Sequence, residues 1–121
     1  MIKVLIIEDE DNLREVYQEE FASENFEVQS ANNGVEGLNK IKSFLPHIVL
    51  LDLLMPQKSG FDVLEQVKKD PALKTIPIVV ITNIYADTQD LVQNWGAKHV
   101  LLKVDYTPGQ LVAKVREILS V

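Results

Sequence analysis

Short apolar runs alternate with longer amphipathic segments along this chain, and this alternation restricts the fold more than any other feature. The apolar runs predict strands at residues 2–7, 27–31, 48–51, 78–81 and 99–102. The first, third and fourth runs are nearly continuous in Val, Ile and Leu, which is typical of strands covered by helices on both faces. The second and fifth runs are more polar, so we expect them at the edges of the sheet.

The segments between the runs carry helix signals. Leu13, Val16, Tyr17 and Phe21 recur at helical spacing and form one apolar stripe. Each of the four later segments begins with a capping pair three residues apart, namely Asn33 with Glu36, Ser59 with Asp62, Asp87 with Asp90, and Thr107 with Gln110.

Five strand–helix units with short connections predict a parallel sheet with helices on both faces. Among the possible strand orders we expect 2-1-3-4-5, which is the doubly wound, flavodoxin-like α/β fold. The 121 residues contain no linker or low-complexity stretch, so we expect residues 1–121 to form a single domain.

Composition excludes several classes of function. The net charge is −6 and the basic residues are scattered, which disfavours direct contact with nucleic acid or an anionic membrane. There is no cysteine, so disulfides and thiolate metal sites are excluded. The first apolar run ends at Glu8, which is too short for a signal peptide or a membrane span. We therefore expect a cytoplasmic protein.

Four of the five predicted strands end on a side chain that can do chemistry. Glu8 and Asp9 follow the first strand, Asp52 the third, Thr82 the fourth and Lys103 the fifth. The carboxyl ends of parallel strands lie at one edge of the sheet, where open α/β sheets bind ligands. These side chains are therefore expected to converge.

The chemistry of such a group is specific. Three clustered carboxylates raise one another's pKa values, and a hard divalent cation such as Mg²⁺ removes that conflict. A lysine ammonium and a threonine hydroxyl complete a set suited to phosphoryl transfer, with an aspartate as nucleophile. Taken singly, each residue is equally well explained as the end of a strand or the cap of a helix, but their coincidence favours a site.

The same residues resemble bacterial response regulator receiver domains, and the resemblance covers essentially the whole chain. The matching segments are VLIIEDE at 4–10, IVLLDLLMP at 48–56, SGFD at 59–62, IVVIT at 78–82, and GAK at 96–98 leading to Lys103. An acidic pair, an Asp-x-x-x-Pro-x-x-x-Gly stretch from Asp52 through Pro56 to Gly60, a threonine and a lysine occur in the order typical of that family.

The resemblance implies a Mg²⁺ site at the end of the first and third strands. Asp9 matches the residue that binds the ion directly, and Glu8 the one that binds it through water. Asp52 and the backbone carbonyl of Leu54 match the remaining protein ligands.

It also implies a phosphoacceptor switch rather than an enzyme acting on an outside substrate. Asp52 matches the phosphoacceptor, while Thr82 and Lys103 match the residues that bind phosphoryl oxygens, so the chain would catalyse its own phosphorylation and slow dephosphorylation. The implied donor is a phosphohistidine on a sensor histidine kinase or a histidine phosphotransfer protein. A downstream protein would read the face formed by residues 87–98, 99–102 and 108–120, and the chain would be a monomer or a weak homodimer.

Some positions depart from the family pattern. Val104 follows Lys103 where many receivers have proline, and we expect a trans bond because a cis bond to a non-proline costs about 2.5–4 kcal/mol. Val100 stands where many receivers have a switching Tyr or Phe, and Tyr85 or Trp95 are candidates to replace it. Apolar residues two positions after Asp52 and Thr82, namely Leu54 and Ile84, favour a long-lived phosphoryl state.

Other functions are weaker candidates. A hydrolase of the haloacid dehalogenase type requires a second Asp two residues past the nucleophile, where this chain has Leu54. A flavin-binding module requires a phosphate-binding loop after the first strand, where this chain has the acidic segment 8–11. A receiver-like interaction module that is never phosphorylated remains the alternative.

Overall fold

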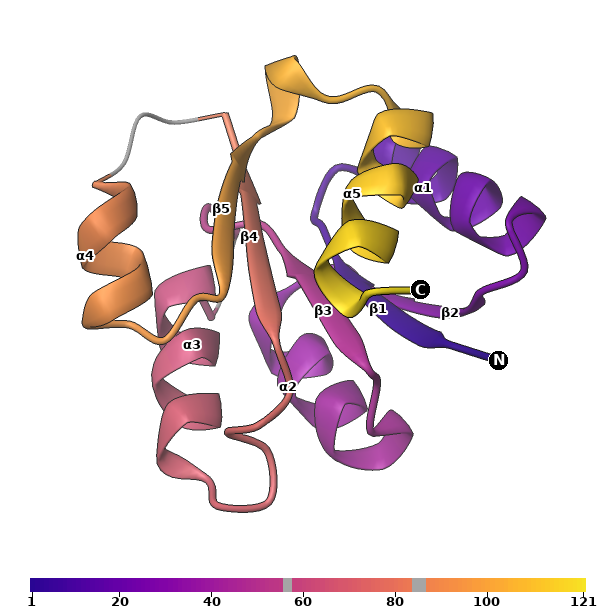
Figure 1. Ribbon diagram of the computed structural model, residues 1–121. Coiled ribbons are helices and arrows are strands. Elements are labelled where there is room, and N and C mark those ends of the chain that lie inside the picture. The colour runs from indigo at the N-terminus through magenta and orange to yellow at the C-terminus, as the bar shows by residue number, and fades with distance from the viewer. Residues whose placement is uncertain (56–57, 84–86) are drawn as a thin grey trace.

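Five parallel strands form one sheet in the computed structural model, which describes residues 1–55, 58–83 and 87–121 (Figure 1). The strands are β1 (Lys3–Ile7), β2 (Glu27–Ala31), β3 (Ile48–Leu51), β4 (Ile78–Thr82) and β5 (His99–Leu102). Their order is β2-β1-β3-β4-β5, so the predicted topology is confirmed and the two polar strands are the edges. Pro56, Ile84 and Tyr85 lie outside the described residues.

Helices cover both faces of the sheet, as predicted (Figure 1). They are α1 (Asp11–Ser23), α2 (Gly34–Phe44), α3 (Gly60–Lys69), α4 (Thr88–Gln93) and α5 (Pro108–Leu119), with a short 3₁₀ helix, η1 (Lys103–Asp105), after β5. One core cluster joins the sheet to α1 and α5, and a second joins it to α2, α3 and α4. No helix in the described segments is both long enough and apolar enough to cross a bilayer.

The central strands supply both clusters because side chains alternate along a strand. In β1, Leu5 and Ile7 belong to the cluster with α2 and α3, whereas Val4 and Ile6 belong to the cluster with α1 and α5. All four are buried. This two-sided burial explains the continuous apolar runs in the sequence.

Four helices begin at the predicted caps. Ser59 and Thr107 form complete capping boxes, and the side chains of Asn33 and Asp87 accept a hydrogen bond from the backbone N–H three residues on. Helix α1 differs, because its N-cap residue, Glu10, makes no side-chain cap.

The first residue of α3, Gly60, packs tightly against the end of β3. The backbone N–H of Gly60 donates to the carbonyl of Leu53 at 2.9 Å. A Cβ atom at Gly60 would lie 2.5 Å from the carbonyl oxygen of Asp52 and 2.6 Å from the Cα of Leu53. Both neighbours are backbone atoms, so this position requires glycine and holds the segment that carries Asp52.

Gly60→Ala is expected to lower the free energy of unfolding by about 2–3 kcal/mol, because the added methyl group overpacks a rigid backbone contact. Gly109→Ala is the matched control, since a Cβ there meets only the Glu20 side chain at 3.4 Å. That change should be neutral or stabilise the helix by up to about 1 kcal/mol. Urea denaturation of both variants measures the difference, and equal stabilities would contradict the packing argument.

Candidate metal and phosphoacceptor site

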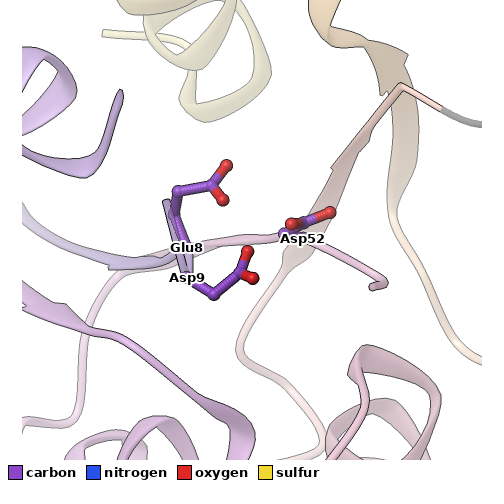
Figure 2. A group of neighbouring side chains, drawn as sticks. All are labelled: Glu8, Asp9 and Asp52. Carbon is purple, nitrogen blue, oxygen red and sulfur yellow. The ribbon is translucent and has the colours of Figure 1, made fainter. Parts of the chain in front are cut away.

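Three carboxylates meet at the carboxyl edge of the sheet, where the side chains of Glu8 and Asp9 extend toward Asp52 (Figure 2). Each offers an oxygen within 4.8 Å of the other two. The register explains the meeting, because β1 pairs with β3 with Ile7 opposite Leu51, and the N–H of Asp52 donates to the carbonyl of Ile7 at 3.0 Å. The predicted convergence of these three residues is confirmed.

Lys103 joins the cluster from the far side of β4. Its ammonium nitrogen lies 2.5 Å from Glu8 Oε1 and 3.4 Å from Asp52 Oδ2. Glu8 is only 2% exposed and Asp52 7%, whereas Asp9 is exposed at the rim. The Lys103 ammonium, on a side chain that is 12% exposed, therefore bridges two buried carboxylates.

The other two predicted site residues flank this group. Thr82 is the last residue of β4, the strand between those that precede Asp52 and Lys103, and it is 1% exposed. The backbone N–H of Leu54 donates to Asp52 Oδ1 at 3.4 Å, while the Leu54 side chain is 55% exposed. All six predicted residues thus lie at or beside one edge of the sheet.

Burial dominates the electrostatics of the cluster. It raises the pKa of Glu8 to about 7, against the opposing hydrogen bonds from Lys103 and from the N–H of Glu10. Burial also raises the pKa of Asp52, although the charge of Lys103 opposes the shift. For Lys103 itself, burial would lower the pKa, but the hydrogen bond to Glu8 and the charge of Asp52 outweigh it, so its pKa is raised. The single ammonium of Lys103 therefore does not offset the effect of burial on the two carboxyl groups.

The donor atoms fit a hard divalent cation. Oxygens around an octahedral Mg²⁺ lie about 2.1 Å from the ion, which separates adjacent oxygens by about 3 Å and opposite ones by about 4.2 Å. The three carboxylate oxygens lie within 4.8 Å of one another, which is close to this range. A water between one carboxylate and the ion would accommodate a longer separation. Exposure of Asp9 leaves room for such waters.

Sequence reasoning missed Arg14. Its guanidinium donates from Nη1 to the carbonyl of Glu8 at 3.0 Å and pairs through Nη2 with Asp11 at 2.7 Å. A signal was present, because Arg14 is the only basic residue between Lys3 and Lys40 and follows an acidic run.

The structure describes several of the positions that are relevant to the departures from the family pattern. The described residues contain no cis peptide bond, so the bond between Lys103 and Val104 is trans, as expected. Val100 is half-buried and packs against the apolar cluster under α2 and α3. Trp95 packs edge to face on Phe61, with ring centroids 5.1 Å apart.

Both buried carboxylates have higher pKa values in the folded chain than in the unfolded chain, so the folded chain holds more protons, for Glu8 between about pH 4.5 and 7. Stability should therefore fall as pH rises through this range. Asp52→Asn is expected to raise the free energy of unfolding by about 1–3 kcal/mol near pH 8 and to weaken this pH dependence.

Glu19→Gln serves as the control, because Glu19 is exposed on α1 and the same loss of charge should leave the pH dependence unchanged. Denaturant titrations across the pH range measure both variants. An Asp52→Asn variant no more stable than wild type near neutral pH would contradict the account.

Comparisons with known proteins agree with this geometry. Residues 4–116 match the family model of the response regulator receiver domain. The chain is 34% identical over 121 residues to the response regulator ArlR of Staphylococcus saprophyticus, which covers 98% of this chain and 53% of the relative. The chain spans about half the length of the curated relatives it matches.

Solved structures give the same result. A CheY-like receiver domain protein from Methanospirillum hungatei is 26% identical, with a TM-score of 0.87 over 99% of this chain and 94% of that one. The chemotaxis protein CheY4 of Vibrio cholerae has a TM-score of 0.88 over 98% of each chain at 24% identity, a likeness that concerns the fold alone. This chain therefore belongs to the response regulator receiver domain family of two-component signalling.

Proposed function

We propose that this receiver accepts a phosphoryl group on Asp52 and that a Mg²⁺ ion bound by the acidic cluster assists the transfer. One observation supports the proposal above others. Oxygens of Glu8, Asp9 and Asp52 lie within 4.8 Å of one another beside the Lys103 ammonium. Phosphoryl transfer depends mainly on positioning and on neutralising charge, and this set supplies both.

In this proposal Asp9 and Asp52 bind the ion directly, Glu8 binds it through a water, and the carbonyl of Leu54 is a further ligand. When bound, Mg²⁺ would neutralise charge on the transferring group and so allow an anionic donor to approach. The exposure of Asp9 and the burial of Glu8 support this division of roles.

Asp52 acts as the nucleophile. A carboxylate oxygen attacks the phosphorus, the bond between phosphorus and the donor atom breaks, and the donor leaves with that electron pair. The hydrogen bond from the Leu54 N–H to Oδ1 orients the carboxylate, and Oδ2 faces Lys103. The ammonium of Lys103 then pairs with a phosphoryl oxygen, while the Thr82 hydroxyl donates to another.

The phosphorylated state would be read at a distance from Asp52. Thr82 ends β4, and its movement toward the phosphoryl group would favour one arrangement of α4, β5 and α5 over another. This face exposes the apolar residues Val92 and Leu102, and Val104 is exposed in the adjoining η1, which suits a protein partner. We propose a histidine kinase or histidine phosphotransfer protein as donor, a downstream protein as reader, and the cytoplasm as location.

Oligomeric state belongs to the same proposal, and we expect a monomer or a weak homodimer. The alternative function is a receiver-like module that binds partners without phosphorylation. Val100 favours this alternative, since a half-buried aliphatic side chain cannot act as an aromatic switch.

Incubation with acetyl phosphate and Mg²⁺ should add the mass of one phosphoryl group to the wild-type chain, measured by intact mass spectrometry. Asp52→Asn and removal of Mg²⁺ by a chelator should each abolish the addition. Asp105→Asn is the matched control, because Asp105 is exposed in η1 and the same substitution there should leave phosphorylation intact. Addition to Asp52→Asn, or none to wild type, would contradict the proposal, and the second result would favour the interaction module.

A further inference from the structure

We infer that Arg14 is a positioning residue that holds the backbone at Asp9 and thereby sets the affinity of the acidic cluster for a divalent cation. The inference rests on the metal site of the proposed function and adds a residue to it. Arg14 lies in the first turns of α1, and its side chain is 18% exposed.

Arg14 holds the peptide unit that joins Glu8 to Asp9. Its Nη1 donates to the carbonyl oxygen of Glu8 at 3.0 Å, and its Nη2 pairs with Asp11 at 2.7 Å. Because a peptide unit is planar, fixing its oxygen restricts rotation about the Cα–C bond of Glu8, which would otherwise move the whole unit. The Cα atom of Asp9 belongs to this unit, so its position is held as well.

Asp9 depends on its backbone more than the other two carboxylates do. The side chains of Glu8 and Asp52 are buried and contact Lys103, whereas Asp9 is exposed. Within the described residues, no side chain or backbone group makes a hydrogen bond or ion pair with the Asp9 carboxylate. The places that its carboxylate can reach are therefore set by the positions of the Asp9 Cα and Cβ atoms.

The segment from Glu8 to Asp11 has few other restraints. Helix α1 lacks the side-chain cap that begins the other four α-helices. The N–H of Glu10 donates to Glu8 Oε2 at 3.1 Å, and the N–H of Arg14 donates to the carbonyl of Glu10 at 2.9 Å. The guanidinium of Arg14 also links the Glu8 carbonyl to the Asp11 carboxylate through two hydrogen bonds. Asp9 and Glu10 lie between these two residues in the chain.

Position and charge predict opposite effects of removing this guanidinium. A positive charge near the cluster opposes cation binding, so loss of charge alone would tighten Mg²⁺ binding. Loss of positioning would weaken it, as changes behind metal ligands commonly do. Arg14→Lys separates the two, because lysine keeps the charge but cannot donate to both groups through a planar fork.

The test is the dissociation constant of Mg²⁺ for the unphosphorylated chain, measured by isothermal titration calorimetry at constant ionic strength. We expect Arg14→Lys to weaken binding about tenfold. Arg116→Lys is the matched control, because Arg116 likewise donates to a backbone carbonyl and a carboxylate of one segment, at Glu24. That change should leave Mg²⁺ affinity as in wild type.

Phosphorylation by acetyl phosphate provides the second readout. At saturating Mg²⁺ the rate of phosphorylation of Arg14→Lys should return to near the wild-type value, since Arg14 touches neither Asp52 nor the phosphoryl group.

Three outcomes would each overturn the inference. They are wild-type Mg²⁺ affinity in Arg14→Lys, tighter Mg²⁺ binding in Arg14→Met, which removes the charge together with the hydrogen bonds, and a rate defect that Mg²⁺ does not overcome. Absence of Mg²⁺ binding in wild type would instead overturn the metal site itself, which separates the two failures. Circular dichroism verifies that each variant is folded. If Arg14→Met does not fold, the result for Arg14→Lys alone decides the test.

Discussion

A single ammonium shared between two buried carboxylates determines the electrostatics of the site at the carboxyl edge of the sheet. Lys103 lies 2.5 Å from Glu8 and 3.4 Å from Asp52, and neither acid has appreciable contact with solvent. One positive charge cannot compensate two negative ones in a buried setting, so burial still raises the pKa of both acids. Buried ion groups of this kind contribute little to stability. A ligand that supplies the missing positive charge, as proposed above for Mg²⁺, would account for their presence.

The fold produces this arrangement by placing strand ends rather than by local sequence. β1 and β3 are neighbours only because the chain crosses over, and this crossover brings residues 8 and 52 together. The tight return at Gly60 and the tie from Arg14 then hold the two segments that carry the acids. The site is thus a property of the sheet order, with nearby loops adjusting its geometry.

Much of this architecture was predictable from the sequence for identifiable reasons. The strands at 27–31, 48–51 and 99–102 match their predicted bounds, and four helices begin at the predicted caps, because hydrophobic alternation and capping are local signals. The apolar stripe predicted for α1 was less accurate, since Val16 is exposed although its spacing suggested burial. β4 extends to Thr82, which pairs within the ladder opposite Leu102 rather than following the strand.

The site was predictable to the level of which residues meet and not to the level of their contacts. Strand ends indicated that Glu8, Asp9, Asp52 and Lys103 converge, but the preference of Lys103 for Glu8 depends on the path of a long side chain past β4. The isolated positive charge of Arg14 was visible in the sequence, but its hydrogen bond to the Glu8 backbone carbonyl was not. The roles of Thr82 and of the Leu54 carbonyl stay predictions.

In the proposed function, the acidic cluster exchanges protons for a divalent cation. This exchange is tested by the gain in free energy of unfolding on adding one fixed excess of Mg²⁺, determined by urea denaturation near pH 5 and near pH 8. Because a cation competes with protons for the carboxylates, the gain should be larger near pH 8, where Glu8, with a pKa of about 7, has lost its proton. Equal gains at both pH values, or no gain near pH 8, would contradict the account.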